Sequence, residues 1–284
     1  MALSALRRHG ALVALLPDGR LHLQHGPIDV IAEAFGEAPA IRAAYARAAG
    51  RFASILEELV AELPALRAEA APVTGRIARR MAAAVASFRP AFITPMAAVA
   101  GAVAEEVLGA LVGPGLTRAY ANNGGDIALW LAPGETLTCA LAVTGGLDRA
   151  TIRASDAVRG IATSGWRGRS FSFGIADAVT ILARSAAEAD AAATMVANAV
   201  SIDHPGIRRR PACELHCDSD LGDRLVTVEV PPLLSDERVL ALGSGLRLAE
   251  SLMNRGLIQG AAIFLQGEFR MTGAVLHKRE AAGG

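Results

Sequence analysis

Residues 120–127 read YANNGGDI and separate two apolar, strand-like segments, Leu116 to Ala121 and Asp126 to Ala132. Two consecutive glycines accept positive φ angles, and Asn-Gly is a strong short-range signal for a β-hairpin. The stretch therefore predicts two antiparallel strands joined by a tight turn. Its amide and carboxylate groups also surround a backbone that a ligand can approach closely, so a ligand-binding loop is the alternative. The candidate ligand-contacting residues of this turn are Asn123, Gly124, Gly125 and Asp126.

Helical patterns concentrate before this turn, and strands mixed with helices follow it. Helices are expected within Pro39 to Ala70 (broken near Pro64), Gly75 to Phe88, Met96 to Leu111 after a Thr94 cap, Ala186 to Val200 and Asp236 to Arg255. Further strands are expected at Ala11 to Leu16, Arg20 to Gln24, Thr136 to Val143, Gly160 to Ser164, Ala178 to Ala183, Leu225 to Val230 and Ala261 to Gln266. This order favours an α+β fold over a regular βαβ alternation.

We expect one domain over residues 1–284. An N-terminal hairpin and helical layer would occupy residues 1–90, and a core of mixed or antiparallel sheets with packed helices would carry the ligand pocket in residues 91–276. No fixed-period repeat or low-complexity linker divides the chain.

The composition excludes several classes of protein. Hydrophobic residues make up 52% of the 284 residues, which is incompatible with a disordered chain. Lys plus Arg and Asp plus Glu both number 28, so the basic excess of a dedicated nucleic-acid binder is absent. The longest apolar stretch, Ile93 to Val112, contains two glutamates, so we expect no membrane-spanning helix. Three cysteines are too few for a disulfide framework, which indicates a cytoplasmic protein.

Residues 160–170, GIATSGWRGRS, suit an anion such as phosphate. Glycine-rich backbone offers free N–H groups, hydroxyls donate hydrogen bonds, and arginine forks pair with phosphate oxygens. The alternative is an exposed loop around a buried tryptophan. The candidate anion-binding residues are Thr163, Ser164, Gly165, Arg167, Arg169 and Ser170.

A third segment, residues 188–194 (EADAAAT), lies on an expected helix. Asp190 and Thr194 are four positions apart, so they share one helical face. A carboxylate and a hydroxyl placed in this way suit a hard cation such as Mg²⁺, which takes oxygen ligands and bridges to phosphate. Asp177, in the loop before the strand at 178–183, offers one more carboxylate to the same site.

Taken in order, these three stretches resemble the ApbE-like superfamily, whose characterised members are FAD:protein FMN transferases. The resemblance covers roughly residues 94 to 200. It matches Asn123 to Asp126 to the Gly-Gly-Asp loop of the family, Thr163 to Gly165 to its Thr-Ser-Gly segment, and Asp190 with Thr194 to its cation ligands, with Asp177 in the preceding segment. It implies Mg²⁺ and FAD as cofactors, a flavin or other phosphate-bearing small molecule as ligand, and an acceptor protein as partner.

The chain departs from the transferases at two places. Their Lys-Gly element corresponds to residues 97–101, AAVAG, which contain no lysine, and the histidine-rich segment and Asp-Pro that follow Thr-Ser-Gly are absent. The chain resembles more closely a cytosolic branch of ApbE-like proteins in bacteria and archaea. Some relatives of that branch are linked to sulfur transfer in homocysteine formation.

Three functional hypotheses therefore stay open. The first is a Mg²⁺-dependent protein that transfers or processes a flavin nucleotide; the second is a non-catalytic flavin or nucleotide binder; the third is a sulfur-transfer protein that uses Cys213 or Cys217. These two cysteines, with His216 and His204, also have the spacing of a partial zinc site. Cys139 lies in an alternating strand and is interpreted as a small core residue. The oligomeric state is left open, a homo-oligomer being one alternative.

Overall fold

A ten-stranded antiparallel sheet forms the framework of the protein. The computed structural model describes residues 6–8, 10–143, 146–273 and 276–277. In spatial order the strands are β1 (Leu6–Arg8), β2 (Ala11–Leu15), β3 (Leu21–His25), β4 (Ile28–Gly36), β5 (Leu116–Asn123), β6 (Asp126–Leu131), β9 (Gly160–Ser164), β10 (Ala178–Ala183), β13 (Gly260–Leu265) and β14 (Glu268–Thr272). Two small sheets complete the strands: β7 (Thr136–Val143), β8 (Gly146–Arg153) and β15 (Leu276–His277), and β11 (Arg208–Pro211) with β12 (Leu225–Glu229).

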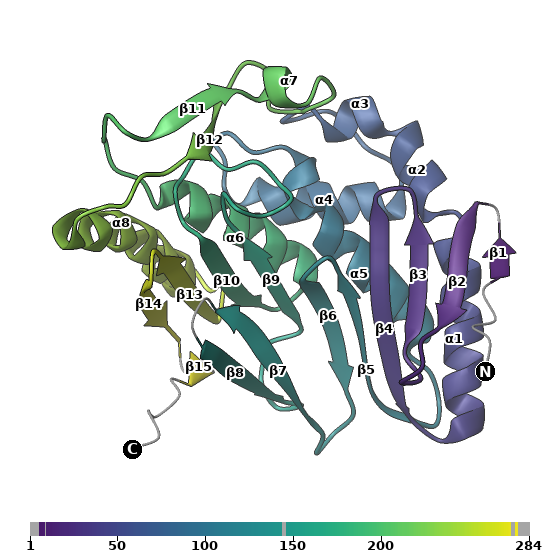
Figure 1. Ribbon diagram of the computed structural model, residues 1–284. Helices are drawn as coiled ribbons and strands as arrows, with labels where there is room; N and C mark the ends of the chain where they lie inside the picture. The colour runs from purple at the N-terminus through teal and green to yellow at the C-terminus, as the bar shows by residue number, and fades with distance from the viewer. Residues whose placement is uncertain (1–5, 9, 144–145, 274–275, 278–284) are drawn as a thin grey trace.

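Helices cover one face of the large sheet, and β7 with β8 covers part of the other (Figure 1). The helices are α1 (Ala38–Phe52), α2 (Ile55–Ala61), α3 (Leu63–Leu66), α4 (Arg76–Ala86), the 3₁₀ turn η1 (Pro95–Ala98), α5 (Val99–Leu111), α6 (Ala186–Ala199), α7 (Ala212–Leu215) and α8 (Ser235–Asn254). This arrangement is α+β, as the sequence predicts. No helix in the described part of the chain has both the length and the apolar character that crossing a bilayer requires.

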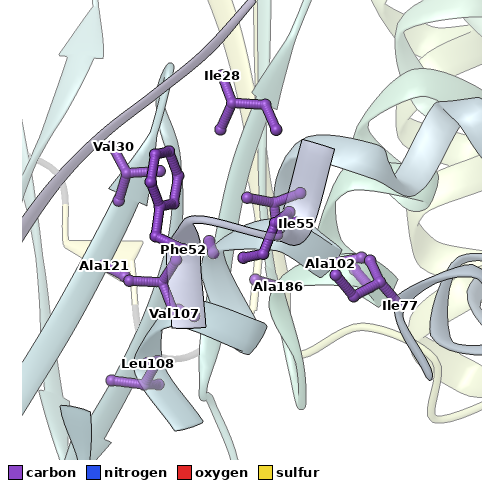
Figure 2. Close-up of a cluster of buried hydrophobic side chains, with 14 of the residues drawn as sticks. Ile28, Val30, Phe52, Ile55, Ile77, Ala102, Val107, Leu108, Ala121 and Ala186 are labelled. Atoms are coloured by element: carbon purple, nitrogen blue, oxygen red, sulfur yellow. The ribbon is translucent and has the colours of Figure 1, made fainter. Parts of the chain in front are cut away.

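The core divides between the two faces of the sheet. Figure 2 shows side chains from β4, α1, α5 and β5 gathered in one cluster, among them Val30, Phe52, Val107 and Ala121. A second cluster joins α6 and α8 to β9, β10 and β13. A third lies between the large sheet and the β7–β8 pair and includes Ile152 and Phe264. Alanine and aliphatic side chains make up nearly all of these contacts, as the low aromatic content requires.

Several expected elements are confirmed and several are corrected. The hairpins β2–β3 and β5–β6 and the helices α6 and α8 lie where the sequence predicts them. The expected helix over 39–70 is three helices, α1 to α3, with Pro64 in the first turn of α3. The strands β1, β4, β8, β11, β14 and β15 are not predicted. Thr94 does not cap the following helix, because its hydroxyl donates instead to the carboxylate of Asp220.

The backbone of α6 lies unusually close to its neighbours. Eight of its residues are buried, and seven of those are alanines. A Cβ atom at Gly101 of α5 would lie 2.2 Å from the carbonyl oxygen of Ala186, and a Cβ at Gly160 of β9 would lie 2.2 Å from the backbone of Ser185. Real Cβ atoms do not come so near to backbone atoms, so glycine is required at both positions for this packing.

Gly101→Ala is therefore expected to lower the free energy of unfolding by at least about 1–3 kcal/mol, because α5 and α6 must move apart to admit one methyl group. Gly109→Ala in the same helix is the matched control, since a Cβ there meets nothing within 4 Å. That control should raise the free energy of unfolding by about 0.5–1 kcal/mol, the difference in helix propensity. Urea unfolding of the two variants measures both values, and equal stability would contradict the packing argument.

Candidate functional site

A cavity of about 930 Å³ lies where the β5–β6 hairpin meets helices α2, α3 and α6. The end of β9 and the loop that follows it form a second wall, and the segment after α7 contributes a third. Of the residues singled out from the sequence, eleven line this cavity. They are Asn123, Gly124, Gly125, Asp126, Thr163, Ser164, Gly165, Arg169, Ser170, Asp190 and Thr194. Three stretches separated by up to 70 residues in the chain thus meet at one place.

The Gly124–Gly125 turn is a hairpin turn that also lines the cavity, so the hairpin interpretation is confirmed and ligand binding stays a prediction. It is a hairpin turn, because Asn123 pairs with Asp126 and the two glycines have φ angles of 66° and 115°. The Asn122 side-chain oxygen accepts a hydrogen bond from the Gly125 amide at 2.8 Å. The same turn also forms part of the cavity wall. The geometry of the hairpin turn therefore sets the positions of the polar groups in this part of the cavity wall.

Arg167 and Asp177 do not line the cavity, in contrast to the expectation from the sequence. The Arg167 Nε atom lies 2.9 Å from Asp177 Oδ1, and the guanidinium carbon lies 4.9 Å from the centre of the Trp166 ring. Asp177 also accepts a hydrogen bond from the Gln266 amide. The two charges hold the loop after β9 against the β13–β14 turn, so their visible role is structural.

Arg169 lies beside the Gly124 turn at the cavity wall. Its Nη2 atom donates to the Pro27 carbonyl oxygen at 3.3 Å, and its Nη1 atom would lie 3.3 Å from a Cβ at Gly124. The side chain is exposed and has no carboxylate partner among the ion pairs of the described residues. An anion in the cavity can therefore reach this guanidinium.

Two carboxyl groups, those of the buried Asp126 and the half-buried Asp190, lie side by side in the cavity wall. Asp126 Oδ1 accepts a hydrogen bond from the Thr163 amide at 3.1 Å, and Asp190 Oδ2 accepts one from the Gly101 amide at 3.0 Å. Burial raises the pKa of Asp126 to about 7. Burial and the neighbouring Asp126 carboxylate raise the pKa of Asp190 well above its ordinary value. A pair of this kind must share a proton or hold a cation.

Helix α6, which carries Asp190, is joined to α5 by two reciprocal side-chain-to-backbone hydrogen bonds. Asp190 of α6 accepts its hydrogen bond from the first turn of α5, while Glu105 of α5 accepts one from the Ala187 amide in the first turn of α6 at 2.8 Å. Each helix thus satisfies an otherwise unpaired N–H of the other. The carboxylate of Asp190 is fixed by rigid elements rather than by a loop.

A polar stripe runs along the otherwise alanine-rich face of α6. Asp190, Thr194 and Asn198 follow one another at intervals of four residues, and all three line the cavity. The sequence interpretation omits Asn198. The signal that could have found it is the continuation of the same spacing by one more turn.

The donor set fits a hard divalent cation. Carboxylate oxygens come from Asp126 and Asp190, and a hydroxyl oxygen comes from Thr194. Mg²⁺ is usually held by one or two carboxylates together with water and ligand phosphates, rather than by a complete protein cage. Among the described residues no group of three His, Cys, Asp or Glu side chains could hold a metal ion, so Cys213 and Cys217 do not form part of a zinc cluster there.

The cysteines show no sign of activation. Cys213 donates from its Sγ atom to Asp223 at 3.1 Å, and this carboxylate raises the pKa of the thiol. Cys217 is exposed, and neither residue lines the cavity. Cys139 does reach the cavity from β7, where burial raises the pKa of its thiol to about 11. A reactive thiolate needs the opposite shift.

Another part of the cavity wall is apolar. It consists of leucines from α2 and α3 together with aromatic side chains from the segments that precede η1 and follow β9: Leu56, Leu59, Leu63, Leu66, Phe92, Phe171 and Phe173. The Phe92 and Phe173 ring centres are 6.2 Å apart. The cavity therefore suits an elongated ligand with a charged end and a flat apolar end.

Comparisons with known proteins agree with the resemblance seen in the sequence. A family model described as "AbpE bacteria" matches residues 13–271, and the chain belongs to this family. It is 38% identical over 121 residues to a UPF0280 protein of Methanococcoides burtonii, covering 40% of this chain and 49% of the relative. It is 34% identical over 172 residues to a UPF0280 protein of Methanoregula boonei, covering 54% and 69%.

The chain spans about half the length of the first of these relatives. Among solved structures, the apo form of the Pseudomonas stutzeri flavinyl transferase ApbE matches with a TM-score of 0.41 and 12% identity, covering 95% of this chain and 94% of that one.

The carboxyl pair predicts an unusual pH dependence of stability. The folded pKa of Asp126 is raised to about 7, so between pH 4 and 7 the folded protein retains a proton that the unfolded chain has released. Its contribution to the free energy of unfolding therefore falls as pH rises through that window, by up to about 1.4 kcal/mol per pH unit. In Asp126→Asn this contribution disappears.

Urea unfolding at pH 5 and pH 7.5, without divalent cations, measures the effect. Wild type should lose more stability between the two values than Asp126→Asn does. Asp203→Asn is the control, because Asp203 is exposed and lies outside the cavity wall. The same pH dependence in all three proteins would contradict the raised pKa of Asp126.

Proposed function

We propose that this member of the AbpE family binds a flavin dinucleotide together with a divalent cation and processes it at the pyrophosphate bond. The observation that carries the proposal is the adjacent pair of carboxyls, the buried Asp126 and the half-buried Asp190, at the polar end of an amphipathic cavity. Such a pair is costly to bury unless a cation or proton compensates it, and a cation bridging to phosphate oxygens is the ordinary compensation.

Under this proposal, different residues of the cavity bind the cation, the phosphates and the flavin ring. Asp126, Asp190 and the hydroxyl of Thr194 would hold the cation. Arg169, with Ser164 and Ser170 nearby, would bind phosphate oxygens, and the aromatic and leucine wall would receive the flavin ring. When bound, Mg²⁺ supplies stabilisation of the negative charge that develops on the phosphate oxygens. An acceptor protein would then approach the open side of the cavity.

A second candidate is binding of the flavin nucleotide without cleavage. The stretch Ala97 to Gly101, which corresponds to the Lys-Gly element of the transferases, offers no side-chain cation. The Ala100 carbonyl oxygen accepts a hydrogen bond from Asn123 Nδ2 at 3.2 Å, which ties this stretch to the hairpin instead. Sulfur transfer is less well supported, because the Cys213 thiol has a raised pKa and neither Cys213 nor Cys217 lines the cavity.

Incubation of the purified protein with FAD and Mg²⁺ separates the two candidates. Release of FMN and AMP, followed by chromatography, supports processing. A rise in melting temperature with FAD and Mg²⁺ but without products supports binding alone, since a ligand of the folded state must raise apparent stability. Absence of both effects at millimolar Mg²⁺ would contradict both candidates.

Asp190→Asn tests the role of the carboxylate pair. The amide oxygen of asparagine can still accept the hydrogen bond from Gly101, so the α5 end stays satisfied while one charge is lost. We expect product formation to fall at least about tenfold, the lower end of what disturbing a metal site usually costs. The additional thermal stabilisation by Mg²⁺ in the presence of FAD should disappear as well. Asp203→Asn should keep both properties, and an unaltered Mg²⁺ response in Asp190→Asn would contradict the assignment.

Arg169→Ala and Arg167→Ala form a matched pair for the phosphate contact. Loss of Arg169 should weaken FAD binding by about 1.5–3 kcal/mol, the range for a hydrogen bond to a charged group. Loss of Arg167, which pairs with Asp177 outside the cavity wall, should leave FAD affinity near that of wild type. Titration calorimetry gives both affinities. Equal losses in the two variants would contradict a phosphate contact that is specific to Arg169.

A further inference from the structure

Asn198 is the member of the α6 stripe that neither the cation nor the phosphate contact requires. Its Oδ1 atom accepts two hydrogen bonds, from the Phe173 amide at 2.9 Å and from Ser172 Oγ at 3.1 Å. A backbone N–H can only donate, so the atom that faces Phe173 must be the oxygen. The orientation of the side-chain amide is thereby fixed.

The fixed orientation leaves the amide nitrogen, Nδ2, available to donate to a ligand. In the part of the chain that the structure describes, no group accepts a hydrogen bond from Asn198 Nδ2, and the residue lines the cavity. This nitrogen carries two N–H donors. The cavity thus presents a neutral donor whose position is set by the protein's own backbone.

The surroundings of Asn198 are held in place from several sides. The Ser172 hydroxyl accepts a hydrogen bond from the Gly174 amide at 3.1 Å, and the Ser172 carbonyl accepts one from Thr227 of β12 at 2.8 Å. The Ile175 amide donates to Val200 just beyond α6 at 2.8 Å. This places Phe171 and Phe173, which line the cavity, next to the donor. A preorganised donor beside aromatic rings suits a flat heteroaromatic group that carries acceptors.

The position along α6 separates this donor from the charged end. Asn198 lies eight positions after Asp190, which corresponds to about 12 Å along the helix axis. A ligand whose phosphate lies at Asp190 would therefore meet Asn198 with a part remote from the phosphate. A flavin ring has such acceptors in its carbonyl oxygens and ring nitrogens.

We propose that Asn198 is a specificity-determining residue, which donates a hydrogen bond from Nδ2 to a neutral acceptor on the ring of the ligand. The proposal rests on the proposed function, because it assumes that a flavin occupies the cavity. It adds that the stripe on α6 binds the cation at one end, through Asp190, and the ring at the other end, through Asn198.

Asn198→Asp is the informative variant. A carboxylate oxygen still accepts from Phe173 and Ser172, so the internal contacts remain, whereas the donor to the ligand becomes an acceptor. Riboflavin is the probe, because it carries the ring without phosphate and is uncharged. We expect the riboflavin Kd, measured by quenching of flavin fluorescence, to rise at least about tenfold, the size of one lost hydrogen bond with an unsatisfied partner.

Asn122→Asp measures the contribution of added charge. Asn122 also lines the cavity and accepts a backbone hydrogen bond through Oδ1, so its aspartate variant keeps that bond and adds the same charge elsewhere on the wall. The loss in Asn198→Asp has to exceed the loss in Asn122→Asp. Equal riboflavin affinity in the two variants overturns the proposal.

A measurement on the wild-type chain keeps the test independent of folding of the variants. The sequence contains four asparagines, Asn122, Asn123, Asn198 and Asn254, so selective ¹⁵N-asparagine labelling gives four side-chain NH₂ pairs. Riboflavin should shift the pair of Asn198, and an unchanged Asn198 pair at saturation overturns the proposal. If wild type binds neither riboflavin nor FAD, the proposed function itself fails; if it binds both and Asn198 does not respond, only this inference fails.

Discussion

The close approach of helix α6 to the elements around it is the constraint on which the rest of the structure depends. Gly101 and Gly160 admit its first turn to within contact of the α5 and β9 backbones, and alanines fill nearly all of its buried positions. A helix with larger side chains would stand several ångströms further from the sheet. Asp190 would then no longer reach the Gly101 amide, and the carboxyl pair with Asp126 would not form.

This packing also explains how two carboxyls can be kept in one buried place. Their mutual repulsion and desolvation disfavour the charged pair, as the raised pKa values of Asp126 and Asp190 show. Hydrogen bonds from the Thr163 and Gly101 amides act in the opposite direction and hold one oxygen of each group. Because the donors are backbone groups of rigid elements, the pair cannot relax by moving apart. The fold thus retains a pair of carboxyls that needs a proton or a cation for compensation, and pKa shifts of this kind are common at functional sites.

The sequence predicts the parts of this structure that local chemistry controls. The Asn-Gly and Asp-Gly turns reveal hairpins, and the periodic patterns reveal α6 and α8. The strand β4 is missed because Glu33 and the surrounding alanines resemble the helix that begins only two residues after it. Thr94 resembles a cap, but its partner Asp220 lies 126 residues away, and no local pattern reports such a contact.

The same contrast between local patterns and long-range contacts applies to the candidate site. The order of three short stretches is sufficient to predict residues that come to line one cavity, although each stretch alone is weak. The sequence does not distinguish Arg167 from Arg169. The two lie only two positions apart in one loop, yet Arg167 pairs with Asp177 and Arg169 lies at the cavity wall. The distinction affects the charge of the cavity wall, because Arg169 lies there and Arg167 does not. With both carboxyls ionised, Asp126, Asp190 and Asp220 oppose Arg67 and Arg169 along the cavity wall, so the residues there do not favour a phosphate by themselves. Under the proposed function the cation must reverse this balance, and by linkage a bound phosphate must strengthen cation binding by the same factor.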